Sequence, residues 1–420
     1  MTWQKTRPVL ISILTVCLIL GVSIGIIAYG RGYRVNLNRP TQLKPTGLVS
    51  ATSDPVGAQV FLDNQLKTAT NNSFNVEPGW YTVRIIKEGF IGWEKKLRVQ
   101  GEVVTRADAY LFPTSPSLSP ITTSGVLSAT LSPDGGKIAF LVPSDAIKDG
   151  IKKPGLYVLE LADRPLGRNR DPKFIADLPA DLKEAPLLLW SPDATQIIIF
   201  GSNDSTLYTL TDNTREVLTQ TRLTAILGDW RAEVAEKDLQ KLVAFRQPFI
   251  DVATSSARIL SFSPDETKLL YEATAAATIV RVIEPPFLGA NPTEEVRTIK
   301  PGNMYVYDSR EDKNFFLLEK KEIQITNDQI PKKPSPKNQA IGNSSPNRLV
   351  WFPTNKHLLL TGNSKIDIME YDRTNWITLY SGPFEGSFVT PWPTGSRIVI
   401  LTNLNPTGST LPNLYTVNLR

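Results

Sequence analysis

One short sequence motif, called the phrase below, constrains the fold of this chain more than any other feature, because it occurs five times between residues 131 and 395. The three intact copies carry Ser-Pro-Asp and begin at Ser132, Ser191 and Ser263. Two degenerate copies, called the worn copies below, have Thr354 and Thr394 in place of the aspartate. Ser at the first position and Pro at the second are typical of a type I turn. A short apolar run follows each turn and favours a strand buried on both faces.

A second phrase follows the turns and completes a repeating module. Four copies carry tyrosine at their second position, namely Leu156–Leu159, Leu207–Leu210, Met304–Tyr307 and Leu414–Val417. Ile366–Met369 fills the corresponding place after the fourth turn. Such a module cannot cover its flat apolar faces alone, so its copies must pack on one another. Blades arranged around an axis achieve this with few exposed edges.

The two phrases resemble the repeats of TolB-like and WD-type β-propeller proteins. The likeness covers residues 114–420 and implies an all-β propeller. About five to six blades are expected, because five copies are visible and the long gaps between them leave room for another.

Composition narrows the class of partner. The chain has 420 residues, enough for two or three domains. Its formal net charge of +5 is modest for this length and comes without a nucleic-acid-binding motif, so no nucleic-acid partner is predicted. Cys17 is the single cysteine, which rules out a disulfide within the chain.

An uncharged apolar stretch runs from Pro8 to Tyr29. It is long enough to cross a bilayer as a helix and longer than the apolar region of an ordinary signal peptide. Residues 1–30 are therefore predicted to be a cytoplasmic tail and an uncleaved transmembrane signal anchor, followed by a juxtamembrane linker over residues 31–46. Basic residues stand on both sides of the stretch, so charge alone does not orient it. We predict a single-pass cell-membrane protein with an extracytoplasmic body, mainly from the family resemblance described in the next paragraph.

Residues 47–113 are predicted to be a separate small β domain, because short strand-like runs alternate there with turn signals. Ser53–Asp63, Glu77–Val83 and Lys87–Phe90 resemble the strands of the PEGA domain. Leu66–Thr70 departs from the Gly-x-Thr-Pro that is usual in that family. The resemblance implies a β-sandwich on the outer face of a cell envelope, with a binding or spacer role rather than catalysis.

A Pro/Ser linker, residues 113–120, leads into the predicted propeller. Three insertions interrupt the propeller. The insertions lie near residues 222–250, 284–303 and 331–347. The first contains the one helix predicted outside the membrane, over residues 228–247. Asp229 is expected to cap this helix and Pro248 to end it, with an apolar stripe of Ala235, Leu239 and Leu242 between them. The other two insertions are rich in proline and are predicted to be loops.

No familiar catalytic or cofactor motif is present. His357 is the single histidine and stands in an apolar run, so packing or a local hydrogen bond is the favoured interpretation. The sequence lacks a nucleophile elbow, a phosphate-binding loop and a dinucleotide-binding turn. It also lacks the His and Cys ligands of a common zinc site. No cofactor and no metal ion is therefore predicted.

Carboxylates are the remaining candidates for chemistry. Asp134, Asp193 and Asp265 stand at the third position of their turns, where Asp bonds to its own backbone, so they are interpreted as turn residues. A pair of carboxylates from different blades would escape analysis by spacing, however. An enzyme that cleaves glycosidic bonds with two carboxylates therefore stays open.

Two sets of aromatic residues are singled out. The candidate ligand contacts are Trp80, Tyr81, Phe90 and Trp93 of the small domain, because exposed aromatic side chains bind sugar rings and protein surfaces. The second set precedes three of the turns at equivalent places and is predicted to wedge between blades: Trp190, Phe262 and Trp351.

These observations favour a membrane-anchored, extracytoplasmic, non-enzymatic binding or scaffold protein of the cell envelope, whose propeller recognises a protein or a glycan. The alternative is a carboxylate-based envelope glycan hydrolase or lyase.

Overall fold

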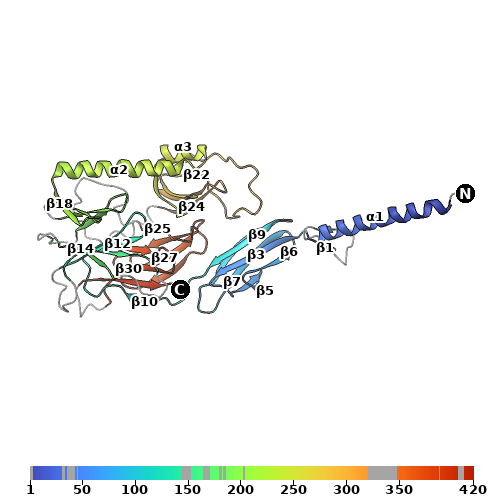
Figure 1. The fold of residues 1–420 in the computed structure, drawn as a ribbon, viewed down its shortest axis with the longest axis horizontal. Helices are drawn as coiled ribbons and strands as arrows, with labels where there is room; N and C mark the ends of the chain where they lie inside the picture. Colours follow the sequence, from blue (N-terminus) through green and yellow to red (C-terminus); the bar gives the residue numbers. More distant parts are fainter. Residues whose placement is uncertain are drawn as a thin grey trace. The chain divides into compact units, whose positions relative to one another are not determined.

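The computed structural model places the chain in two compact units. It describes residues 3–30, 34–35, 43–44, 46–143, 153–163, 171–178, 182, 186–201, 204–319, 348–386, 388–404 and 411–420. The first unit comprises Met1–Leu111 and Ile283–Thr293, and the second comprises Phe112–Val282 and Glu294–Arg420. Figure 1 gives the course of the chain.

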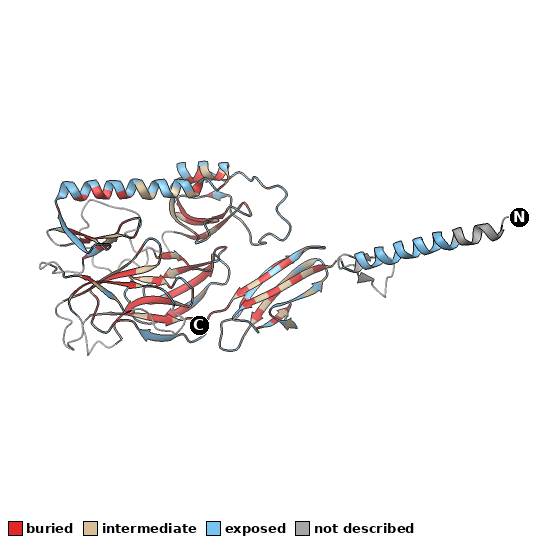
Figure 2. Ribbon diagram, viewed as in Figure 1, coloured by how far each residue is buried: buried red, intermediate tan, exposed pale blue. Residues whose placement is uncertain are grey.

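Helix α1 (Trp3–Gly30) contains the apolar N-terminal stretch. Its side chains are described for residues 11–27 and Gly30, and all of these are exposed, as Figure 2 shows. Among the described residues, no helix has both the length and the apolarity that a membrane crossing requires. Of the predicted linker over residues 31–46, the structure describes Thr46 and two paired strands, β1 (Arg34–Val35) and β2 (Leu43–Lys44).

Seven further strands of the first unit form two sheets. The first sheet has the order β6-β3-β9, with β6 (Asn72–Val76), β3 (Gly47–Asp54) and β9 (Val104–Tyr110). The second has the order β5-β4-β7-β8, with β5 (Gln65–Ala69), β4 (Gln59–Leu62), β7 (Gly79–Ile86) and β8 (Trp93–Val99). β3 and β9 run parallel, and the other pairs are antiparallel.

One apolar core joins these two sheets into a sandwich. Ala51 and Ala107 of the first sheet pack with Val60, Val83 and Leu97 of the second. Successive side chains of a strand point to opposite faces, and Figure 2 shows the resulting alternation of buried and exposed residues. The other face of each sheet is therefore left to solvent or to partners.

The second unit is built from antiparallel sheets of four strands each, five of them within the described ranges. Sheet 1 has β11 (Ser128–Leu131), β12 (Lys137–Val142), β13 (Gly155–Glu160) and β14 (Lys173–Ala176). Sheet 2 has β15 (Leu187–Trp190), β16 (Gln196–Phe200), β17 (Ser205–Thr209) and β18 (Thr214–Leu218). Sheet 3 has β19 (Ala257–Phe262), β20 (Lys268–Ala273), β23 (Asn303–Asp308) and β24 (Lys313–Glu319). Sheet 4 has β25 (Leu349–Trp351), β26 (His357–Thr361), β27 (Lys365–Glu370) and β28 (Ile377–Ser381).

Sheet 5 closes the ring, because it takes strands from both ends of the second unit. Its order is β10-β31-β30-β29, with β10 (Ser117–Pro120), β29 (Val389–Pro391), β30 (Arg397–Thr402) and β31 (Asn413–Asn418). Part of the predicted Pro/Ser linker is thus the outer strand of the last sheet. The Thr122 hydroxyl fastens the junction: it donates to Asn413 Oδ1 at 3.0 Å and accepts the Leu414 N–H at 2.9 Å.

Within the described ranges, three pairs of neighbouring sheets share apolar cores, as the blades of a propeller do. Leu141 of sheet 1 lies in one cluster with Ile199 of sheet 2, and Val306 of sheet 3 lies in one cluster with Leu358 of sheet 4. A further cluster joins sheets 5 and 1 and so connects the end of the second unit to its beginning. The prediction of an all-β propeller body is confirmed, and each copy of the repeated phrase corresponds to one sheet.

All five copies of the phrase form the same backbone turn between two paired antiparallel strands. These are the first two strands in sheets 1 to 4, and β29 and β30 in sheet 5. In the first copy the Gly135 N–H donates to Ser132 O at 2.9 Å, and the Ser132 N–H donates to Lys137 O at 2.8 Å. The fourth residue of each turn has positive φ, and the five are Gly135, Ala194, Glu266, Asn355 and Gly395. The worn copies therefore keep the turn although their side chains differ.

The first insertion holds two helices rather than the single one predicted over residues 228–247. α2 (Gln220–Leu242) begins earlier, because the Thr219 hydroxyl accepts the Arg222 N–H and caps it. Asp229 lies inside α2, and Pro248 stands in the first turn of α3 (Gln247–Ser255), where proline suits a helix start. Of the predicted stripe, Leu242 is buried as expected, whereas Ala235 and Leu239 are exposed. The other buried residues of α2 are Leu223, Ile226, Leu227 and Trp230.

In Figure 1, α2 runs from β18 of sheet 2 to α3, which lies beside sheet 3. Ile226 and Trp230 of α2 pack on sheet 2, and Phe249 of α3 packs on sheet 3. Lys237 Nζ donates to Pro192 O in the turn of sheet 2 at 3.3 Å, and Lys241 Nζ lies 2.9 Å from Glu266 Oε1 in the turn of sheet 3. α2 therefore bridges the two turns.

The second insertion begins before the predicted residue 284. A small hairpin of β21 (Ala277–Thr278) and β22 (Thr298–Ile299) stands at its base. Asp312 of sheet 3 fastens it: the carboxylate accepts the Val282 N–H at 2.6 Å and Arg297 Nη1 at 3.1 Å. The loop predicted over residues 331–347 lies outside the described residues.

Candidate functional site

The three intact turns hold their aspartates by local hydrogen bonds. The Ser191 hydroxyl donates to Asp193 Oδ1 at 2.5 Å, and the Ser263 hydroxyl donates to Asp265 Oδ1 at 2.7 Å. Ser132 and Asp134 make the same contact. Partial burial opposes ionisation of each carboxyl group, but the hydrogen bonds outweigh it and lower the pKa of all three. The aspartates are therefore ionised turn residues, as the sequence predicts, and poor candidates for a general acid.

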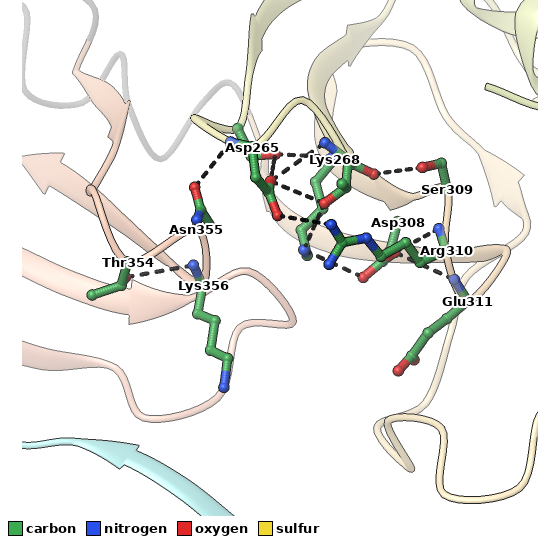
Figure 3. Close-up of polar contacts among 11 residues, drawn as sticks. Asp265, Lys268, Asp308, Ser309, Arg310, Glu311, Thr354, Asn355 and Lys356 are labelled. Atoms are coloured by element: carbon green, nitrogen blue, oxygen red, sulfur yellow. Dashed lines mark hydrogen bonds and ion pairs between the residues drawn. The ribbon is translucent and has the colours of Figure 1, made fainter. Parts of the chain in front are cut away.

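A set of polar contacts lies where the turns of sheets 3 and 4 meet, as Figure 3 shows. We call Asp265, Lys268, Asp308, Arg310 and Asn355 the turn cluster. The Asp265 N–H donates to Asn355 Oδ1 at 3.0 Å and so links the two sheets. Arg310 Nη2 lies 3.6 Å from Asp265 Oδ2.

Lys268 is the buried centre of the turn cluster, with 6 % of its surface exposed. Its Nζ lies 3.6 Å from Asp308 Oδ2 and 3.2 Å from Thr267 Oγ1. It also stands 5.0 Å from the centre of the Tyr371 ring, which belongs to the neighbouring sheet. A buried ammonium needs such partners, because burying it alone would cost several kcal/mol.

Asp308 is equally committed to structure. It accepts the backbone N–H of Arg310 at 2.9 Å and of Glu311 at 3.3 Å, and thereby shapes the turn between β23 and β24. The side chains of Glu311 and Lys356 extend away from these contacts in Figure 3. The turn cluster therefore links two sheets, and its acidic and basic side chains balance one another in charge. The charged side chains of Glu311 and Lys356 lie at its margin.

The remaining buried carboxylates of the described propeller also have protein donors. Asp312 accepts from Tyr307 Oη at 2.8 Å as well as from the second insertion, and burial together with this bond raises the pKa of Tyr307. Asp367 accepts from Trp376 Nε1 at 3.1 Å and Thr378 Oγ1 at 2.7 Å. Within the described ranges, no group of three His, Cys, Asp or Glu residues is placed to hold a metal ion.

His357 is packed rather than poised for proton transfer. It is 3 % exposed, its Nδ1 lies 2.7 Å from Thr354 Oγ1, and its ring meets Phe112 edge-on at 5.6 Å. This placement agrees with the interpretation from the sequence.

Two of the three predicted wedges lie between blades. Trp190 Nε1 donates to Thr130 O of sheet 1 at 3.4 Å, and Trp351 Nε1 donates to Ser261 O of sheet 3 at 3.3 Å. Each tryptophan thus reaches the first strand of the preceding blade, β11 or β19. Phe262 instead packs on Phe245 at 5.8 Å, because the helices of the first insertion precede sheet 3.

The four candidate aromatics of the sandwich do not share a surface. Trp93 is 5 % exposed and lies in the core, and Tyr81 and Phe90 pack against that core. Trp80 is 52 % exposed, on the opposite face of β7 from Tyr81. Trp80 is therefore the member of the set that is placed to meet a ligand.

The sequence alone does not predict which basic residues lie beside Trp80. Lys96 Nζ stands 5.6 Å from the centre of the Trp80 ring, and Arg98 is the cross-strand partner of Trp80. The alternation of Glu94, Lys96 and Arg98 along one strand-like run is the signal that could have revealed them, once the register of β7 and β8 is known.

Comparison with known proteins identifies the sandwich. Residues 46–115 match the PEGA domain family, as the resemblance implies. No curated protein matches the sequence.

Among solved structures, the chain is similar to TolB from Acinetobacter baumannii, with 14 % identity and a TM-score of 0.22, over 80 % of this chain and 59 % of that chain. A putative TolB from Agrobacterium tumefaciens shows 11 % identity and a TM-score of 0.20, over 89 % and 99 %. An oligogalacturonate lyase from Vibrio parahaemolyticus shows 8 % identity and a TM-score of 0.31, over 73 % and 94 %. The propeller assignment rests on the order of the strands, and the protein thus combines a PEGA domain with a β-propeller of four-stranded sheets.

Proposed function

We propose that the protein is a membrane-anchored, extracytoplasmic binding or scaffold protein of the cell envelope, without catalytic activity of its own. The observation that carries the proposal is the closure of the propeller by β10, which pairs with β31 over four residues. Closure joins the two ends of the propeller, leaves only short sheet edges and makes a rigid body that presents turns and loops to partners. The PEGA domain would act as a second contact or as a spacer.

The anchor is part of this proposal. The stretch from Pro8 to Tyr29 carries no charge, and the described side chains of α1 include exposed Leu14, Leu18 and Ile24. A row of large apolar side chains on an isolated helix is unfavourable in water, and a bilayer is the solvent that suits it. The PEGA match supports an extracytoplasmic placement, because the resemblance implies an envelope role.

The alternative, a carboxylate-based glycan hydrolase or lyase, requires two carboxylates about 5–9 Å apart beside a bound sugar. Asp265, Asp308 and Asp312 are instead taken up by hydrogen bonds and ion pairs within the fold. These contacts count against the three carboxylates as such a catalytic pair.

The proposal is tested by protease digestion of intact cells that produce the full chain with a C-terminal tag. We expect the tag to sediment with membranes and to be lost on external digestion, while a cytoplasmic marker survives. Deletion of residues 3–30 should release the tagged body from the membrane fraction. A tag that stays fully protected in intact cells, or a deletion variant that still sediments, would contradict the proposal.

A further inference from the structure

One face of the sheet β5-β4-β7-β8 points to solvent and carries a regular set of side chains. We call this face the outer face of the sheet, and it includes Trp80, Thr82, Arg84, Glu94, Lys96 and Arg98. Register places Trp80 opposite Arg98 and Thr82 opposite Lys96. Arg84 follows opposite Glu94, with their side chains 3.3 Å apart. The outer face therefore has a neutral end, at the Arg84–Glu94 pair, and an aromatic basic end at Trp80.

Trp80 is not needed by the core of the domain. The core already holds Trp93, Val83 and Leu97, and Trp80 lies on the opposite face of the sheet with 52 % of its surface exposed. Tryptophan is enriched at binding interfaces, because it combines a large apolar ring with a polar N–H group. Lys96 over the indole ring restricts its orientation through a cation–π contact.

The positive charge at this end arises from placement and not from composition. Residues 46–111 carry seven Lys or Arg and seven Asp or Glu side chains, so the domain has no net charge. Arg84 is neutralised by Glu94, whereas Lys96 and Arg98 face Thr82 and Trp80 across the strands. Two cations thus flank one exposed aromatic ring.

We propose that Trp80, Lys96 and Arg98 bind an anionic glycan, in which sugar rings carry carboxylate or phosphate groups. The indole offers a flat apolar surface to a sugar ring, and the two cations pair with the acidic groups beside it. The inference rests on the proposed envelope function, and it names the ligand class of the PEGA domain.

A glycan fits this surface better than a lipid bilayer. Thr82 and Arg84 follow Trp80 on the same face of β7, so polar side chains and not an apolar cluster adjoin the ring. Peripheral membrane binding usually needs a wider apolar surface or a larger basic cluster than one ring and two cations.

The test measures binding of the purified full chain in detergent to four probes. Polygalacturonate supplies carboxylates, poly(glycerol phosphate) supplies phosphates, dextran is neutral, and phosphatidylglycerol vesicles stand for a membrane. We expect binding to one or both anionic polymers, weakened by salt. Trp80→Ala should weaken it about fivefold, and Lys96→Gln with Arg98→Gln about tenfold.

Matched variants separate this surface from general charge and general hydrophobicity. Arg106→Gln with Lys173→Gln removes the same charge from exposed sites elsewhere, and Phe287→Ala removes another exposed aromatic ring. Both should bind as the unmodified chain does, and circular dichroism should show that every variant is folded.

Three results would overturn the proposal. The first is that the Trp80 and Lys96/Arg98 variants bind the anionic polymers as tightly as the unmodified chain does. The others are binding to dextran as tight as to the anionic polymers, and binding to the vesicles alone. The outcome is separable from the proposed function. A body digested from outside the cell that binds neither polymer would defeat this inference only. A protected body that binds one of them would defeat the proposed location only.

Discussion

The five turns of the propeller fall into two kinds that share one backbone and differ in what holds it. In the intact copies a serine hydroxyl bridges the aspartate and the strand that follows: Ser263 Oγ donates to Asp265 and accepts the Lys268 N–H at 2.9 Å. In the worn copies the serine position is taken by Phe352 and Trp392, and neither ring is exposed. The backbone bonds persist, with the Trp392 N–H donating to Arg397 O at 2.9 Å. A turn of this shape can therefore be held by polar contacts or by aromatic burial.

The aromatic turns should be the more sensitive to truncation. Trp392→Ala leaves a large cavity between sheets 5 and 1 and should lower the free energy of unfolding by about 3–5 kcal/mol. Trp392→Phe should cost less than half of that, because the Trp392 Nε1–H has no hydrogen-bond acceptor among the described residues. Urea unfolding followed by fluorescence measures both variants. Equal losses for the two would mean that the indole N–H, and not the buried volume, matters at this turn.

The polar turns should lose less. Ser263→Ala leaves the buried Lys268 N–H and the Asp265 carboxylate without the hydroxyl, and the free energy of unfolding should fall by about 1–3 kcal/mol. Ser263→Thr keeps the hydroxyl and serves as the matched variant in the same urea experiment. A loss from Ser263→Ala as large as that from Trp392→Ala would remove the distinction between the two kinds of turn.

Only the polar turns should add a pH dependence. The pKa of Asp193 is lowered from its usual 3.8 by Ser191 and Thr195 against the effect of burial, so the ionised carboxylate stabilises the fold above that pH. This contribution is lost as the pH falls through the folded-state pKa. Asp193→Asn should therefore lower the melting temperature near neutral pH and match the unmodified chain in strong acid.

Calorimetry over a pH series measures this gap, with Asp204→Asn as a control at an exposed loop position. A gap between Asp193→Asn and the unmodified chain that stays constant down to about pH 2 would show that ionisation is not what stabilises the turn.

The smallest effect is expected where a turn meets the first insertion. Lys241→Ala removes the partly exposed contact with Glu266 and should cost less than about 1 kcal/mol. Added salt should erase the difference from the unmodified chain, because exposed ion pairs are screened. A salt-independent loss would indicate that the cation–π contact of Lys241 with Phe262, at 5.7 Å, holds α2 in place.

The sequence predicts what each repeat does within its own blade but not what stands beside it. Trp190 and Phe262 occupy equivalent places, yet the first reaches a neighbouring blade and the second reaches Phe245 after α2. The helix start was misplaced because Asp229 offers a capping side chain as good as that of Thr219, and packing on sheet 2 decided between them.

The candidate site was predictable only in part for a related reason. Alternation along β7 predicts that Trp80 and Tyr81 face opposite sides, but it does not say which side is the core. The burial of Trp93 and the pairing of Trp80 with Arg98 depend on the register between β7 and β8, which the turn composition does not specify.

The closure of the propeller is most directly tested by a disulfide between β10 and β31. Ser119 and Thr416 are paired across these strands, and paired residues lie within the range that a disulfide spans. With Cys17→Ser in the background, oxidation of a Ser119→Cys/Thr416→Cys chain should give an intramolecular cross-link that migrates faster on a non-reducing gel. The account predicts efficient cross-linking here and none for a Ser119→Cys/Ser205→Cys control. Failure of the first pair to cross-link, or equal cross-linking of the control pair, would contradict a ring closed by β10.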